Sequence, residues 1–221
     1  MKIISWNCNG ALRKKTQYLE DFEADVHVIQ ECENPAQSTK EYQKWAGDYL
    51  WTGQSKNKGI GIFVRNGHSL QALSLNGEFK LSNFGRNGMP VTWKTSDLET
   101  FLPCKIDNRY TLLGIWTKRN NSPNFGYIGQ LWKYLQIHKP DLSGNDTILC
   151  GDLNSNVFWD ETDRWWNHSD VVAELEEMNI YSLYHHYYNE AQGSETRKTL
   201  YMYRNPENAI TLTTFLDLRS S

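Results

Sequence analysis

Short strand-like runs that end on polar residues are the feature that most constrains the fold of this chain. Five such runs, rich in apolar and β-branched residues and followed by polar or turn-type residues, span residues 2–6, 25–29, 59–64, 110–116 and 147–150. Ligands of open α/β sheets bind beyond the ends of the strands, so we expect a site where these runs end.

Helix-like segments alternate with these runs, at residues 12–22, 127–138 and 169–178. Ser169 with Asp170 is typical of a helix start, because a short polar side chain can cap the free amides there. Residues 65–67, Arg-Asn-Gly, indicate a hairpin-type turn. Strands interleaved with helices predict a layered α/β or α+β protein with two sheets or one large mixed sheet.

The length of 221 residues fits one sizeable domain, and the sequence contains no internal repeat or linker-like change of composition. No apolar run is long enough to span a membrane. The first residues turn polar too early for a signal peptide, so we expect a cytoplasmic protein.

The four cysteines show no Cys-x-x-Cys pairing, which favours reduced thiols over a zinc or redox site.

The net charge of −3 argues against a protein that coats nucleic acid by bulk charge. It leaves room for an enzyme that holds a phosphate backbone along one local basic strip. The candidate segments for such a strip are 13–15, 118–119 and 197–198, and each taken alone is typical of a solvated surface.

Oxygen-bearing side chains follow three of the strand-like runs: Asn7, Glu31, and Asp152 with Asn154. Each has an ordinary structural explanation, since the two asparagines are typical turn residues, Glu31 a solvated strand end and Asp152 a turn or cap residue. Their joint occurrence favours a site for a hard cation such as Mg²⁺, which prefers carboxylate and amide oxygens.

Four motifs occur in the order used by the endonuclease/exonuclease/phosphatase superfamily: Trp6-Asn7, Gln30-Glu31, Lys58-Gly59-Ile60-Gly61 and Gly151-Asp152-Leu153-Asn154. Within that superfamily the chain most resembles small bacterial exonuclease III-like proteins, over nearly its whole length. The resemblance implies an α/β (α+β) four-layer sandwich, with two mostly antiparallel or mixed β-sheets flanked by helices and with its last strands missing or altered. It also implies one such domain over residues 1–209 and a divergent tail over 210–221.

The resemblance also implies a role for each matching residue. Glu31 would bind Mg²⁺, for which Mn²⁺ can substitute, and Asn7 would be a second ligand or an orienting group. Asp152 would orient or deprotonate the attacking water, and Asn154 would hold the scissile phosphate. A metal that neutralises charge and a carboxylate that activates water address the two main obstacles to hydrolysis of an anionic phosphodiester.

Three further residues are candidates for substrate binding. Trp116 stands where the DNA-repair members of the family usually carry a tyrosine that contacts phosphate, and it either contacts substrate or packs in the core. Trp165 and His168 follow the Asp152 motif, where an aromatic face could stack on a base. The sequence indicates no partner for His168 as a general base, and core packing is the competing interpretation for the tryptophans.

The end of the chain departs from the family pattern, which closes with a His-x-Asp-Tyr strand and a Ser-Asp-His motif. Neither follows Pro206. We hypothesise that this end is out of frame, because codons for Ile210 to Arg219 can be chosen that read His-Ile-Asp-Tyr-Ile-Phe-Gly-Ser from the third base. The codons of the gene test this hypothesis, and a natural tail that replaces the last strand is the alternative. Loss of the histidine predicts a fall of about 10²–10⁴ in rate, and loss of a central strand predicts an exposed sheet edge.

The sequence thus favours a Mg²⁺-dependent phosphodiesterase acting on DNA, of the exonuclease III or abasic-site endonuclease type and impaired by its missing end. Two alternatives stay open. One is a phosphatase or phosphodiesterase acting on a small phosphoester or lipid headgroup. The other is a non-catalytic remnant of an enzyme that holds metal or nucleic acid without cutting.

Overall fold

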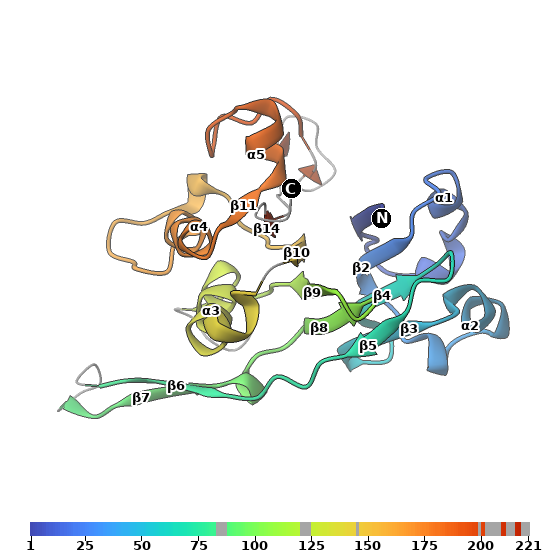
Figure 1. The fold of residues 1–221 in the computed structure, drawn as a ribbon, viewed down its shortest axis with the longest axis horizontal. Helices are drawn as coiled ribbons and strands as arrows, with labels where there is room; N and C mark the ends of the chain where they lie inside the picture. The colour runs from blue at the N-terminus through green and yellow to red at the C-terminus, as the bar shows by residue number, and fades with distance from the viewer. Residues whose placement is uncertain are drawn as a thin grey trace.

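Two β-sheets packed face to face form the centre of the molecule, as seen in a computed structural model (Figure 1). The structure describes residues 1–82, 88–119, 125–144 and 146–198, together with the backbone of residues 200–201, 209–210 and 215–217. In the described residues, no helix is both long enough and apolar enough to cross a membrane.

The first sheet has four strands in the order β1-β2-β4-β3. Their bounds are β1 Ile3–Asn7, β2 Val26–Cys32, β3 Tyr49–Ser55 and β4 Lys58–Val64. β1 runs parallel to β2, whereas β4 is antiparallel to both β2 and β3. The ends of β1 and β2 therefore lie on the same edge of this sheet, and β4 begins there.

The second sheet has six strands in the order β11-β14-β10-β9-β8-β5. Their bounds are β5 Leu70–Ala72, β8 Phe101–Ile106, β9 Tyr110–Trp116, β10 Thr147–Asp152, β11 Ile180–Ser182 and β14 Phe215–Asp217. β9 and β10 are parallel and bring Trp116 level with Asp152. Two short antiparallel pairs stand outside the two sheets: β6 Glu78–Leu81 with β7 Val91–Lys94, and β12 Leu200–Tyr201 with β13 Ala209–Ile210.

Helices cover the outer face of each sheet (Figure 1). Their bounds are α1 Gln17–Glu20, α2 Lys40–Ala46, α3 Ile128–Leu142, α4 His168–Glu177 and α5 Leu183–Tyr188. α1 and α2 pack on the first sheet, and α3 and α4 pack on the second. The four layers confirm the predicted sandwich.

The layers follow from the two-residue repeat of the strands. In β9, Leu112 faces the core between the sheets, and Leu113 faces the core under α3 and α4. In β4, Ile62 faces the core between the sheets, and Phe63 faces the core under α2. Strands that are buried on both faces have nearly continuous apolar sequences. This is why their positions could be predicted well from the sequence.

Two local predictions were wrong. Residues 12–22 form a 3₁₀ turn at Leu12–Lys14 and the four-residue α1, because the backbone leaves the helical conformation at Lys15, where φ is −132°. The turn at Asn66 leads from the first sheet into the second, so β4 and β5 form no hairpin with each other. The helix predicted at 169–178 is confirmed as α4, which begins one residue earlier and has Asn167 as its cap.

The predicted tail supplies an altered final strand. The backbone of β14 pairs antiparallel with β10 at Ile148 and Leu149, and with β11 on its other side. The expectation of an exposed edge beside β10 was therefore wrong over those residues. The hypothesis that residues 210–221 are encoded out of frame stays a prediction.

Gly151 gives a first test of the fold, because β10 approaches β9 so closely there that a Cβ on Gly151 would lie 1.9 Å from the carbonyl oxygen of Ile115. We expect Gly151→Ala to lower the free energy of unfolding by about 3 kcal/mol or more, since backbone cannot move aside as a flexible side chain can. Urea unfolding measures the loss. Gly144→Ala is the matched control, since its Cβ would meet no atom within 4 Å. Equal midpoints for the two variants would contradict this packing.

His27 gives a second test, based on pH. Burial, with a smaller effect of the Arg65 charge, lowers the pKa of His27 to about 4 from its ordinary 6.5. Neither ring nitrogen has a hydrogen-bond partner among the described residues. Since the unfolded chain takes up the proton first, His27 contributes no penalty above pH 6.5, and stability falls as the pH drops from 6.5 toward 4.

We therefore expect His27→Phe to reduce that acid destabilisation by roughly 1–3 kcal/mol at pH 4.5 relative to pH 7.5. The measurement is urea unfolding of both proteins at the two pH values. His186→Phe, at an exposed position of α5, is the control. The interpretation fails if His27→Phe loses as much stability on acidification as the parent protein.

Candidate active site

The ends of β1, β2 and β10 meet at one edge of the sandwich, and Asn7 joins them. The side chain of Asn7 donates from Nδ2 to Oε1 of Glu31 at 3.2 Å and to Oδ2 of Asp152 at 2.8 Å. Asn7 and Glu31 belong to the first sheet, and Asp152 belongs to the second. Three of the predicted site residues, far apart in sequence, therefore lie in hydrogen-bond contact.

A backbone irregularity orients Glu31, and a turn holds Asn7. Glu31 has a positive φ of 62° and lies where the register of β2 against β4 shifts between Gln30 and Cys32. Such a β-bulge leaves one residue outside the ladder and redirects its side chain. Asn7 accepts from the amide of Asn9 through Oδ1 at 3.0 Å, so it is also a turn residue.

Asp152 is a buried carboxylate, with only 4% of its surface exposed. Burial raises its pKa above the ordinary value; hydrogen bonds from Asn7 and from the amide of Asn154 act against this rise, and the charge of Glu31 adds to it. A carboxylate with a raised pKa is a stronger base once it is ionised. The environment of Asp152 thus suits a group that accepts a proton or orients water.

Asn154 connects the carboxylates to a neighbouring cavity. Its amide donates to Oδ1 of Asp152 at 3.0 Å, and its Nδ2 donates to the carbonyl of Thr117 at 2.9 Å. The same residue lines a cavity of about 380 Å³ between the loop after β10 and the start of α3. The other residues that line this cavity are Gly126, Tyr127, Ile128, Ser155, Trp159, Asp160, Arg164, Asn167 and His168.

Two lysines flank the ring of Trp116. Lys58 Nζ lies 5.7 Å and Lys118 Nζ lies 5.1 Å from the ring centroid, and Trp116 itself is 7% exposed. Lys58 also forms an ion pair with Oε2 of Glu31 at 2.7 Å. Trp116 packs in the core between the sheets, and its contact with substrate stays a prediction.

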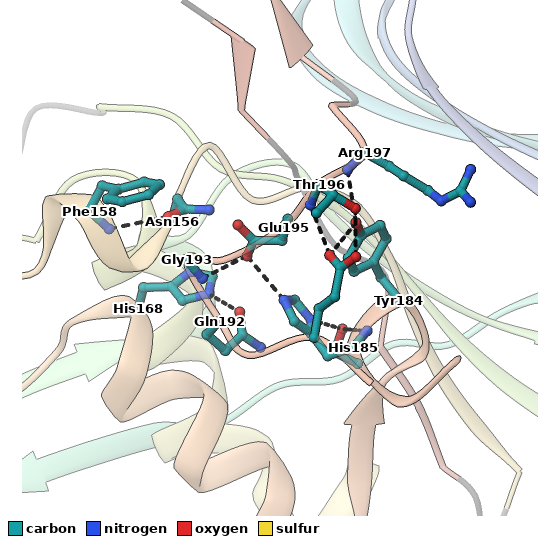
Figure 2. Close-up of polar contacts among 12 residues, drawn as sticks. Asn156, Phe158, His168, Tyr184, His185, Gln192, Gly193, Glu195, Thr196 and Arg197 are labelled. Atoms are coloured by element: carbon teal, nitrogen blue, oxygen red, sulfur yellow. Dashed lines mark hydrogen bonds and ion pairs between the residues drawn. The ribbon is translucent and has the colours of Figure 1, made fainter. Parts of the chain in front are cut away.

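His168 has the partners that the sequence did not indicate. Its Nδ1 lies 3.1 Å from Oγ of Ser155. Its Nε2 lies 3.2 Å from Oε1 of Gln192, a contact shown in Figure 2. Burial lowers the pKa of His168. The imidazole is therefore held neutral between the loop after β10 and the 189–198 segment.

Trp165 belongs to an aromatic cluster under the second sheet, with ring centroids 4.9 Å from Trp132 and 5.9 Å from Phe125. It is 36% exposed, whereas Trp159 is 43% exposed and lines the cavity. Trp159 is thus the tryptophan of this region that the structure places beside Asn154. The role of Trp165 in binding stays a prediction.

The predicted basic strip is partly neutralised. Arg13 forms an ion pair with Glu33 at 2.7 Å, and Lys118 forms one with Glu99 at 3.1 Å.

Two functional candidates were not predicted from the sequence. Lys58 lay within one of the four motifs and had no assigned role. Gln192 carried no sequence signal, because its contact with His168 depends on how a loop folds back.

The donor set at this edge fits a hard cation. Mg²⁺ needs only one or two carboxylates because it keeps several waters, and Glu31 and Asp152 face each other across Asn7. Among the described residues, no group of three or more His, Cys, Asp or Glu side chains could hold a metal ion. Asn7 presents its nitrogen to both carboxylates, which is the geometry of an orienting group.

Comparison with known proteins finds solved structures with a similar fold. No family model and no curated protein matches the sequence. A 3′-5′ exonuclease from Neisseria meningitidis is 15% identical with a TM-score of 0.62, and the match covers 98% of this chain and 87% of that one. An AP endonuclease from Archaeoglobus fulgidus is 14% identical with a TM-score of 0.60, over 98% and 86% of the two chains.

A third match extends the likeness to a protein that carries the superfamily name. An endonuclease/exonuclease/phosphatase family protein from Bacteroides thetaiotaomicron is 15% identical with a TM-score of 0.56, over 99% of this chain and 83% of that one. At such low identities the likeness concerns the fold, and it agrees with the resemblance carried by the four motifs. The chain has the fold of the endonuclease/exonuclease/phosphatase proteins.

Proposed function

We propose that this chain is a Mg²⁺-dependent phosphodiester hydrolase that acts on DNA, as a 3′ exonuclease or an abasic-site endonuclease. The observation that carries the proposal is the hydrogen bonding of Asn7 to both Glu31 and Asp152, at the edge where the two sheets meet. The fold shared with an exonuclease and an AP endonuclease supports the same chemistry.

Each residue of the site has a distinct task in this proposal. Asp152, buried and with a raised pKa, orients the attacking water and accepts its proton. Glu31 would hold Mg²⁺, which when bound supplies positive charge against the anionic phosphodiester. Asn7 keeps the two carboxylates at a fixed separation by donating to each.

The cavity beside Asn154 suits the group attached to the scissile phosphate. Its volume of about 380 Å³ lies within the range of small-ligand sites, and Trp159 and Tyr127 give it aromatic walls. Aromatic side chains can stack on a base or pack against a sugar. With Asn154 holding the phosphate at the entrance, the adjoining nucleoside would enter the cavity.

A small phosphoester is the second candidate substrate. The same cavity can hold a compact molecule, and the net charge of −3 does not favour a long polyanion. A salt titration separates the two, because binding to DNA weakens steeply with salt, whereas binding to a small phosphoester responds far less. A non-catalytic protein that holds metal or nucleic acid without cutting is the third alternative.

The first prediction concerns turnover. We expect the protein to cut a labelled duplex that contains one abasic site, or to shorten a recessed 3′ end, with Mg²⁺ and not with chelator. Asp152→Asn removes the base and lowers the rate by about 10²–10⁴-fold. Asp21→Asn, at an exposed position that contributes no contact to the site described above, serves as the control. A folded protein that cuts neither DNA nor a small phosphoester would favour the non-catalytic alternative.

The second prediction concerns Asn7. Asn7→Ala removes the donor shared by the carboxylates, so repulsion from Glu31 raises the pKa of Asp152 further. The acidic limb of kcat/KM then moves to higher pH, because the base is ionised only above its raised pKa, and kcat/KM at pH 7.5 falls by about 10-fold to 10²-fold. Profiles from pH 5 to 9 measure both effects, with Asn76→Ala, at an exposed position outside the site, as the control. An unmoved acidic limb would contradict this role.

A further inference from the structure

Lys58 supplies a cation to the carboxylate that is predicted to bind metal. Its Nζ lies 2.7 Å from Oε2 of Glu31, while Oε1 of the same carboxylate accepts from Asn7 at 3.2 Å. The Glu31 side chain is 17% exposed and that of Lys58 is 51% exposed. Both oxygens of Glu31 are thus engaged, one by a neutral amide and the other by an ammonium group.

The backbone places Lys58 at this point with little freedom. β3 and β4 are joined by a two-residue turn, with Ser55 opposite Lys58. The next residue, Gly59, packs so closely that a Cβ would lie 2.3 Å from the carbonyl oxygen of Thr52. Gly59 also pairs with Cys32, next to the bulge at Glu31. The lysine stem therefore starts from a fixed position beside the carboxylate.

Lys118 offers a close comparison. Its ammonium also lies against the ring of Trp116, at 5.1 Å compared with 5.7 Å for Lys58. Its partners are different: Glu99 at 3.1 Å and the side-chain oxygen of Gln54 at 3.1 Å. Of the two ammonium groups on this ring, the one from Lys58 pairs with a carboxylate of the site.

We propose that Lys58 is a positioning residue that acts as the built-in counter-ion of Glu31 and as a later anchor for the substrate phosphate. The proposal rests on the proposed function. Because the Lys58 ammonium lies 2.7 Å from Oε2, its charge would repel a metal ion that bound this oxygen. Once displaced from Glu31, Lys58 would carry its positive charge toward the substrate on its half-exposed, flexible stem.

This arrangement has opposite effects on a cation and on an anion. The ammonium of Lys58 opposes metal binding in the absence of substrate, since two cations compete for one oxygen. The same ammonium attracts the phosphate backbone once it has left Glu31. Metal affinity and substrate affinity should therefore move in opposite directions when the charge is removed.

The experiment compares Lys58→Met, Lys58→Arg and Lys118→Met with the parent protein, all at one pH. Mn²⁺ binding without substrate is followed by electron paramagnetic resonance. We expect binding about threefold to tenfold tighter in Lys58→Met, as a partly exposed ion pair of this kind implies, and within about twofold of the parent in the other two. KM for the DNA substrate should rise in Lys58→Met, and the salt slope of binding should fall by about one.

The outcomes separate this inference from the function on which it rests. Equal or weaker Mn²⁺ binding in Lys58→Met, while the parent binds Mn²⁺, overturns the role of Lys58 and leaves the proposed function standing. No Mn²⁺ binding by any of the four proteins overturns the metal-dependent function itself. If Lys58→Met fails to fold, tighter binding by Lys58→Gln carries the proposal, and binding no tighter than the parent overturns it.

Discussion

The close packing of the two sheets is the constraint on which the site depends. Gly114 of β9 lies where Ile60 and Ile62 of β4 cross it, and a Cβ there would be 3.1 Å from Cδ1 of Ile62. Packed sheets stand about 10 Å apart, and side chains from their inner faces meet between them. Asn7 and Asp152 make such a contact at 2.8 Å. Loss of sheet packing would separate the two halves of the site before it changed either half.

The two carboxylates of the site have different surroundings. Glu31 faces an ammonium group and keeps part of its surface in water. Asp152 is buried, and among the described residues its side chain accepts from neutral groups, the amide nitrogens of Asn7 and Asn154. In the proposed function, this contrast would separate the group that binds a cation from the group that accepts a proton.

The sequence was informative where local pattern and tertiary structure agree. β9 and β10 were located because strands buried on both faces give continuous apolar runs, and the positions of Asn7, Glu31 and Asp152 followed from the strand ends. It failed where a distant group intervened. The sequence did not indicate that Glu33 accepts from the amides of Leu12 and Arg13, or that Gln192 reaches His168 from a loop. Neither contact has a signal in the residues that surround it.

The tail shows why the fold and the chemistry respond differently to a change of sequence. β14 joins the second sheet through backbone hydrogen bonds to β10 and β11, and backbone groups pair in the same way for most side chains. An altered reading frame can therefore still supply a central strand. It cannot supply a histidine at a chosen point, and His168 is already held by Ser155 and Gln192. A change confined to the tail should thus leave the sandwich and its paired carboxylates in place.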